Sequence, residues 1–496
     1  MERKIFIKGG TVYDGAGGPG VNSDVYIEGD KIKAVGEEAS AMARADDPAL
    51  SSIDAAGKMV CPGFIDMHAH SDYKIAVNGS MEAKLRQGVT TAVVGSCGFS
   101  GAPMNDRLRR DFKGYLSGMF GTECRFEWDS TAGYIEHIKR IGIGANVFLQ
   151  TGFGNLRQMT MGRSPLKANA GQIAEMKKLL DKSLEEGSRG FSAGLAYPMQ
   201  MFSSTEEVKA LCGTAAKRGA LFSVHVRNEI DKLEEANREV IGIAEETGVS
   251  LQISHHKAIL SRNWGKPRQT MKMMEEARAR GVDVEADVYP FTAFSNILAT
   301  TMLLNEPGME EKVIFLELKK LKQYEGKSLA DVMKDTGKGA KAAALHILFK
   351  EGFSNAPVAG EFISEDDLRF IMSHPLSSIG SDGVETDEGA KAHPRLFSTS
   401  VRFLKHYVLG EKLMPMGEAV RKMTSMPARK IGAARRGLIK EGYFADIAVF
   451  DPDALRDNST YEDPVRYPSG FDAVIVNGEI AVMKDEITSA RAGTVL

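Results

Sequence analysis

The chain has 496 residues, of which 43% are hydrophobic and 26% are charged, a composition typical of a globular protein with a large buried core. Its formal net charge is −3, and no basic stripe is present, which argues against a nucleic-acid partner. The sequence also contains neither a signal-peptide pattern nor the run of about 18 apolar residues that a membrane span needs. We therefore predict a cytoplasmic protein without a membrane partner.

Both ends of the chain consist of short alternating segments separated by turn residues, a pattern typical of β-hairpins. Near the start, the expected strands are Lys4–Lys8, Asp24–Glu28 and Lys31–Val35, separated by a Gly-Gly turn and a Gly-Asp turn. Near the end they are Ala445–Phe450, Ala473–Val476 and Ile480–Met483, with an Asn-Gly turn before the last. Because each terminal piece is too short to bury a core, we predict that residues 1–60 and 430–496 form one composite β-sandwich.

The middle of the chain alternates between strand-like and helical segments, which indicates parallel βαβ units. The eight strand candidates are residues 62–70, 90–98, 145–152, 188–194, 221–229, 250–257, 282–290 and 377–383. Amphipathic stretches such as Ala170–Glu186 and Met271–Arg280 lie between them. Eight such units predict an α/β fold with a catalytic (β/α)8 TIM barrel over residues 61–300 and 361–429.

The regular spacing is interrupted between the seventh and eighth strands. Residues 301–360 contain a segment rich in Lys and Glu, which predicts a helical insertion that could serve as a lid above the barrel mouth. The alternative is an ordinary long connection between a helix and a loop.

Six residues that could bind a metal all stand at the carboxyl ends of predicted strands. They are His68, His70, Cys97, His225, His255 and Asp382. In a (β/α)8 barrel these ends converge on the active-site mouth, and the chain has only 10 histidines in total. The spacing His-X-His places both imidazoles on one face of a strand.

The mixture of nitrogen, sulfur and oxygen donors favours zinc, which in catalytic sites leaves one position open for water. Zinc lowers the pKa of that water toward neutrality, and Asp382 could then accept a proton and pass it to a leaving nitrogen. Two alternatives weaken this interpretation. A lone cysteine such as Cys97 is often a small buried hydrophobe, and the Ser-Asp-Gly around Asp382 also suits a simple turn. Of the remaining cysteines, Cys124 and Cys212 are expected to serve in packing.

The motifs also carry a family resemblance. PGFIDMHAHSD resembles the first-strand signature of the amidohydrolase superfamily, and GSCG, HVRNE, SHHK, DVYP and GSDG followed by HPR resemble the N-acyl-D-amino-acid deacylases, or D-aminoacylases, over nearly the whole chain. The resemblance implies one tightly bound zinc held by Cys97, His225 and His255. It also implies a second, weaker metal position lined by His68, His70 and Asp382.

The same resemblance implies a trio that binds the substrate carboxylate, namely Lys257, Tyr289 and Arg395. A bidentate guanidinium, an ammonium charge and a hydroxyl donor suit a carboxylate chemically. Alternatively, Lys257 could be a surface lysine at a strand end, and Tyr289 could orient the scissile carbonyl. After HPR this chain reads LFSTSVRF, where the family commonly has a Gly-Thr-Phe run, so the loop that carries Arg395 could differ in shape.

The resemblance implies hydrolysis of an N-acyl-D-amino acid, a small-molecule substrate, to a D-amino acid and a carboxylate. Because the segment after Tyr289 is rich in Leu, Met and Phe and has no Arg or Lys up to residue 311, we predict a preference for apolar side chains. The main alternative is a hydantoinase-like enzyme that opens cyclic amides or imides. Dihydropyrimidinases bridge two metals with a carboxylated lysine on the fourth strand, whereas the candidate here, SRGFSAGLAYP, has none.

A non-catalytic scaffold with the same fold is a third possibility. Such proteins typically lose metal ligands, and here all six candidates are present. The sequence makes no prediction of the oligomeric state.

Overall fold

The computed structural model describes residues 3–44, 47–111, 125–304, 307–352, 356–385 and 392–496. Eight parallel strands form its central sheet, and they pair in the order in which they occur along the chain. They are β6 (Phe64–Asp66), β8 (Val89–Val94), β9 (Asn146–Gly152), β10 (Gly190–Gly194), β11 (Leu221–His225), β12 (Ser250–Ile253), β13 (Val284–Val288) and β17 (Ser377–Ile379). Seven of the eight predicted segments contain one of these strands, and β8 begins one residue before its predicted segment, so the predicted barrel is confirmed.

The barrel closes between its first and last strands. The Met67 N–H donates to the Ile379 carbonyl at 3.3 Å, and the short strands β7 (Ala69–His70) and β18 (Gly383–Val384) pair in parallel above this contact. The closure places the segment that contains His68 beside the segment that contains Asp382.

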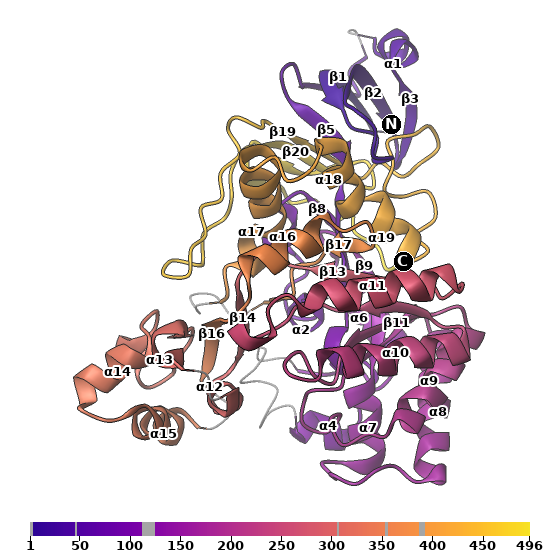
Figure 1. Ribbon diagram of the computed structural model, residues 1–496. Coiled ribbons are helices and arrows are strands. Elements are labelled where there is room, and N and C mark those ends of the chain that lie inside the picture. The colour runs from indigo at the N-terminus through magenta and orange to yellow at the C-terminus, as the bar shows by residue number, and fades with distance from the viewer. Residues whose placement is uncertain (1–2, 45–46, 112–124, 305–306, 353–355, 386–391) are drawn as a thin grey trace.

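Helices cover the outside of the barrel (Figure 1). They are α6 (Thr131–Ile141), α7 (Phe153–Met161), α8 (Ala170–Glu185), α9 (Thr205–Lys217), α10 (Leu233–Thr247), α11 (Lys266–Ala279), α16 (Glu365–Ser373), α17 (Arg395–Arg402), α18 (Met416–Met423) and α19 (Ser425–Lys430). Local sequence explains their starts, because α8 and α9 each begin with a capping box, Asn169 with Gln172 and Ser204 with Glu207. The buried faces of α8, α9, α10 and α11 pack on strands β10 to β13 in one apolar core. Four shorter helices lie elsewhere, α1 (Glu37–Met42), α2 (Asp72–Ile75), α3 (Glu82–Leu85) and α4 (Asp106–Asp111).

The two chain ends join in one β-rich unit, as predicted, and its strands pair in a nine-stranded sheet. It contains β1 (Lys4–Val12), β2 (Val21–Glu28), β3 (Lys31–Val35), β4 (Leu50–Asp54), β5 (Met59–Pro62), β19 (Ile447–Phe450), β20 (Phe471–Val476), β21 (Glu479–Met483) and β22 (Glu486–Ile487). The junction is the antiparallel pair β5–β19. Apolar residues from both ends, among them Ile7, Val25, Ile447 and Ile475, share one core.

The predicted Gly-Gly turn after the first strand is wrong. Strand β1 continues through Gly9 and Gly10, and its register with β2 shifts between Ile7 and Gly10. Gly9 has φ of 69°, a left-handed conformation that lets one extra residue fit into a β-bulge. The glycines therefore bend the strand instead of ending it.

The insertion between the last two barrel strands forms a small subdomain that projects from one side of the barrel (Figure 1). Its helices are α12 (Leu298–Thr301), α13 (Met309–Lys312), α14 (Leu329–Thr336) and α15 (Ala340–Glu351). It also contains an antiparallel sheet that the sequence pattern did not indicate, formed by β14 (Ala293–Ile297), β15 (Val313–Phe315) and β16 (Pro357–Glu361). Residues such as Phe315, Val332, Ile347 and Val358 form a core that continues into the barrel loops through Leu260 and Tyr289.

Two further observations concern the described residues as a whole. None of their helices is long and apolar enough to cross a membrane. Cys61, Cys97 and Cys212 are buried free thiols, whereas Cys124 lies outside the described residues.

Candidate active site

The six predicted ligands meet at the carboxyl end of the barrel. The Cys97 sulfur lies 3.4 Å from Nε2 of His68 and 3.4 Å from Nε2 of His255. Nε2 of His70 lies 3.2 Å from a carboxylate oxygen of Asp382, and Nε2 of His68 lies 3.5 Å from the same oxygen. The ring of His225 completes the cluster, with its centroid 4.4 Å from that of His255. Cys97 thus stands between the two groups of histidines.

Three of these side chains sit on backbone in the left-handed region. The φ angles are 53° at Cys97, 35° at His255 and 48° at Asp382, a conformation that costs free energy for residues other than glycine and that clusters at functional sites. Hydrogen bonds hold two of them in place, since the Asp382 N–H donates to the His68 carbonyl at 2.8 Å and the His255 N–H donates to Asp287 Oδ1 at 2.8 Å.

A glycine explains how the chain reaches Cys97 after β8. Gly95 has φ of 78°, and a Cβ added there would lie only 2.3 Å from the Gln150 carbonyl oxygen. Only glycine fits this turn, which leads directly into the segment that carries Cys97.

The electrostatics of the cluster suit a bound cation. Burial alone would raise the pKa of the Cys97 thiol, but His68 and His255 hold it well below its ordinary value, which favours the thiolate that binds metals. Burial likewise would raise the pKa of Asp382, yet Arg395, His255 and His70 hold it well below its usual range. Although burial would lower the pKa values of His68 and His70, Cys97 and the neighbouring carboxylates raise them. A bound metal ion can replace the protons on these rings.

The donor atoms are close enough to share metal ions. Three sets of three residues have donor atoms within 4.8 Å of one another, namely His68 with Cys97 and His255, His68 with His70 and Asp382, and His225 with Glu229 and His255. A sulfur, several imidazoles and carboxylates at this spacing match the ligand set of zinc.

Sequence reasoning missed several carboxylates that support the cluster. Glu229 lies in the quoted HVRNE motif, and its Oε1 is 3.1 Å from Nδ1 of His255. Asp287, at the end of β13, accepts from the His255 N–H and lies 3.5 Å from Nδ1 of His68. Their position at strand ends was the available signal, because barrel strands deliver such side chains to the mouth.

A buried ion pair fixes the first strand to the last beneath the metal ligands. The Lys84 ammonium lies 2.7 Å from Asp66 Oδ2 and donates to the Ser381 hydroxyl at 2.9 Å. Asp66 also accepts from the Ser381 N–H at 2.7 Å. This network holds the residue that precedes Asp382.

The three residues expected to bind a carboxylate gather beside the cluster. The guanidinium carbon of Arg395 lies 4.8 Å from the centre of the Tyr289 ring, and the Lys257 ammonium lies 5.6 Å from it. Arg395 pairs with Asp382 at 2.9 Å. Its other two nitrogens, like the Tyr289 hydroxyl, are buried without a hydrogen-bond partner among the described residues. Such unused donors are rare in protein interiors and indicate room for a ligand that accepts hydrogen bonds.

A cavity of about 260 Å³ opens beside these residues. The insertion contributes Phe294, Ile297 and Leu304 to its wall. Arg227, which the sequence analysis did not single out, also lines it, but its guanidinium forms two 3.0 Å bonds with Glu239. The insertion also contributes Ser295, Asn296 and Thr301, so this wall combines apolar with uncharged polar side chains. Arg227 already has a carboxylate partner.

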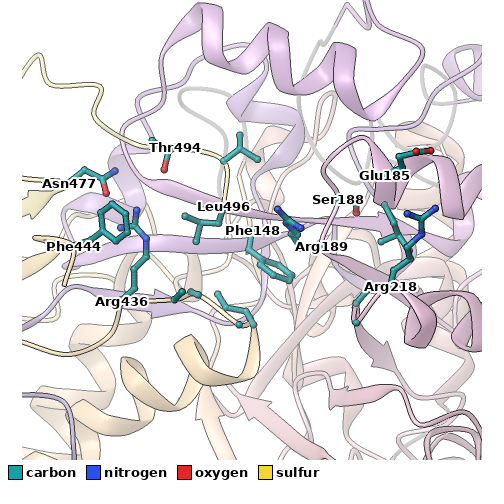
Figure 2. Close-up of a pocket in the computed structure, with 18 of the residues that line it drawn as sticks. Phe148, Glu185, Ser188, Arg189, Arg218, Arg436, Phe444, Asn477, Thr494 and Leu496 are labelled. Carbon is teal, nitrogen blue, oxygen red and sulfur yellow. The ribbon is translucent and has the colours of Figure 1, made fainter. Parts of the chain in front are cut away.

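A larger cavity of about 980 Å³ lies at the opposite end of the barrel (Figure 2). Residues just before or within β9, β10 and β11 line it together with the last residues of the chain, and they include Phe148, Arg189, Ala220, Thr494 and Leu496. None of the predicted site residues lies there.

The fourth strand, β10, has the sequence GFSAG and carries no lysine. The bridging ligand of the hydantoinase branch is therefore absent from this strand. The Cys97 thiol is the group that lies between the two sets of histidines.

Comparisons with known proteins agree with this geometry. A sequence model of the amidohydrolase family matches residues 59–481. The chain is 35% identical to an N-acyl-D-glutamate deacylase of Alcaligenes xylosoxydans xylosoxydans, covering 100% of this chain and 97% of that protein. It is 32% identical to a D-aminoacylase of the same organism, covering 99% and 97%. The chain also resembles the crystal structure of an N-acyl-D-glutamate deacylase from Bordetella bronchiseptica, which was complexed with zinc and a phosphonate inhibitor that mimics the tetrahedral intermediate. The two structures superpose with a TM-score of 0.89 at 32% sequence identity, covering 100% of both chains.

Proposed function

Because the chain belongs to the amidohydrolase family and, within it, to the N-acyl-D-amino-acid deacylases, we propose that it hydrolyses N-acyl-D-amino acids with zinc as cofactor. The products are a D-amino acid and a carboxylate. One observation carries the proposal, namely that a buried set of sulfur, imidazole and carboxylate donors stands beside a guanidinium and a phenol with unused hydrogen-bonding groups.

Cys97, His225 and His255 would hold the tightly bound zinc, and His68, His70 and Asp382 would line a second, weaker position. When bound, zinc acts as a Lewis acid that polarises the amide carbonyl and lowers the pKa of the attacking water. The low pKa of the Cys97 thiol supports its role as a thiolate ligand.

Asp382 is the proposed general base and acid. It would accept a proton from the water that attacks the carbonyl carbon, and it would deliver that proton to the nitrogen as the carbon–nitrogen bond breaks. Asp382 lines the cavity, and Arg395 and His70 hold its carboxylate from two sides, at 2.9 Å and 3.2 Å. These contacts restrict the carboxylate to one orientation, which proton transfer in both directions requires.

Arg395, Tyr289 and Lys257 would bind the α-carboxylate of the substrate. Two guanidinium nitrogens and the phenol have no hydrogen-bond partner among the described residues, so Arg395 can receive a carboxylate without leaving Asp382. A carboxylate fixed at this point, together with the carbonyl at the metal ligands, leaves one direction for the side chain and so distinguishes the two enantiomers.

Apolar side chains are the proposed preference. Phe294, Ile297 and Leu304 give the cavity apolar surface beside the uncharged Ser295, Asn296 and Thr301, and Glu239 already neutralises Arg227. An acidic substrate side chain would therefore be desolvated without an unpaired cation beside it, which is costly. The two relatives named above differ in their stated substrates yet are 35% and 32% identical to this chain, so overall identity does not distinguish these preferences.

The test compares amine release from N-acetyl-D-methionine, N-acetyl-L-methionine and N-acetyl-D-glutamate, with zinc content measured on the same preparation. We expect hydrolysis of the D-methionine derivative alone or fastest, with about one zinc ion per chain. Faster cleavage of the D-glutamate derivative would refute the apolar preference only. Bound zinc without hydrolysis of any of the three would refute the deacylase proposal and direct attention to cyclic amides.

A further inference from the structure

Glu229 lies between the metal ligands and the substrate pocket, and the proposed reaction assigns it no step. It follows β11, four residues after His225, and only 7% of its surface is exposed. Its Oε1 lies 3.1 Å from Nδ1 of His255 and 2.6 Å from the Lys257 ammonium, and its Oε2 lies 3.6 Å from Nε2 of His225. Its carbonyl accepts from the Ile259 N–H at 2.8 Å. The backbone is therefore anchored to the loop after the next strand, which keeps the carboxylate in place.

The first consequence concerns the tautomer of His255. Its Nε2 faces the Cys97 sulfur at 3.4 Å, so a metal bound beside Cys97 would use the lone pair of Nε2. A neutral imidazole that binds through Nε2 carries its proton on Nδ1. The group that surrounds Nδ1 therefore decides whether His255 is ready to bind a metal.

Two groups with opposite effects on the protonation of Nδ1 lie beside it. The Lys257 ammonium is 2.9 Å away and can only donate, so by itself it would favour an unprotonated Nδ1 and move the proton to Nε2. A proton on Nε2 would point at the metal position and block it. The Glu229 carboxylate can only accept, and it favours the proton on Nδ1.

The second consequence concerns Lys257. Its ammonium donates to Glu229 Oε1 and to the His255 carbonyl at 3.0 Å. Both contacts hold it in the wall of the cavity that also contains Tyr289. The same carboxylate oxygen thus orients a metal ligand and a cation of the substrate pocket.

We propose that Glu229 is a positioning residue that sets the metal-binding tautomer of His255 against the opposing influence of Lys257, and that anchors Lys257 in the substrate pocket. Carboxylates that orient histidine ligands in this way raise metal affinity in other sites. The part of the inference that concerns substrate rests on the proposed function, whereas the part that concerns zinc does not.

The test is a double-mutant cycle on zinc affinity, measured with the full chain by competition with a chelator. We expect Glu229→Gln to weaken zinc binding about 10- to 100-fold, the usual range for groups that orient a ligand. In the Lys257→Met background the same Glu229→Gln change should weaken zinc binding much less, because the opposing ammonium is gone. Glu239→Gln is the matched control, since it also removes a carboxylate that pairs with a cation of this cavity but contacts none of the six predicted ligands, and zinc affinity should be unchanged.

Unfolding midpoints of the same variants, recorded without metal, separate loss of fold from loss of ligand orientation. If Glu229→Gln alone does not fold, the comparison of Lys257→Met with the double variant still measures the effect of Glu229 when Lys257 is absent. A loss of zinc affinity of about 10-fold or more in that comparison would overturn the proposal. Unchanged zinc affinity in folded Glu229→Gln would overturn it directly. Because no arm uses a substrate, failure of the deacylase proposal would leave this test intact.

If zinc binds as expected, the deacylase assay adds a second readout. Glu229→Gln loaded with saturating zinc should raise KM for N-acetyl-D-methionine more than it lowers kcat, because its remaining defect is the position of Lys257. A role limited to packing would not divide the effect in this way.

Discussion

The two ends of the barrel contain cavities of opposite character. The cavity at the carboxyl end of the strands measures about 260 Å³ and the one at the amino end about 980 Å³. The smaller cavity adjoins two arginine nitrogens and a phenol that are buried without partners among the described residues. In the larger one, carboxylates hold two of the arginines, Arg218 through two 2.8 Å bonds to Asp181 and Arg436 through Asp446. Within the described residues, the larger cavity also has one unused amide oxygen, that of Asn477. The cluster of metal-binding side chains, and not volume, therefore distinguishes the proposed active site.

The contrast has a physical origin in the barrel itself. Side chains that follow the parallel strands converge at the carboxyl end, where loops can carry chemistry without disturbing the packing. At the amino end the last residues of the chain lie against the barrel, with the Val147 N–H donating to the Thr494 carbonyl at 2.9 Å. One end thus presents reactive groups, and the other joins the barrel to the chain terminus.

The largest effect that would sharpen the comparison is expected at Asp382. Asp382→Asn keeps the size of the side chain but cannot accept and return a proton, so kcat should fall by about 10²- to 10⁴-fold. The measurement is turnover of N-acetyl-D-methionine, with zinc content as the control because Cys97, His225 and His255 remain. Turnover within about twofold of the parent protein would remove Asp382 from general-base catalysis.

A smaller effect is expected at Arg395. Arg395→Lys keeps the positive charge beside Asp382 but loses the fork of donors that suits a carboxylate. Loss of one charge-assisted hydrogen bond, worth about 1.5–3 kcal/mol, should reduce kcat/KM by about 10- to 100-fold. Most of the change should appear in KM, and discrimination between the D and L substrates should decline. A variant with unaltered KM would contradict the assignment of Arg395 to the substrate carboxylate.

The smallest effect is expected in the larger cavity. The side chains of Arg218 and Asp181 are 40% and 47% exposed, and exposed ion pairs contribute little to stability, so Arg218→Ala should leave the midpoint of unfolding nearly unchanged. Denaturant titration measures this midpoint, and kcat/KM should stay within about twofold of the parent value. A loss of activity above tenfold would break the comparison, because it would mean that the two ends of the barrel are coupled.

Features that depend only on neighbouring residues in the chain could be predicted from the sequence. The eight barrel strands and the six candidate ligands were found because strand periodicity and strand ends can be read without knowing the partners. The Gly-Gly turn at Gly9 and Gly10 was predicted wrongly because a bulge is defined by the neighbouring strand, here β2. The sheet of the insertion was missed for the same reason, since β14 pairs with β16, more than 55 residues further along the chain.

For this protein, the sequence by itself determined the barrel, the union of the two chain ends in one sheet, and the residue types that stand at each strand end. Only the tertiary structure decided which of these side chains meet and which are already paired. The proposed role of Glu229 depends on His255 and Lys257, which follow β12 and contact its carboxylate. Arg227 is not expected to bind an acidic substrate side chain, because Glu239 of α10 already pairs with it. Charge compensation depends on distances between segments that are remote in sequence, and these distances are fixed only when the strands and helices pack.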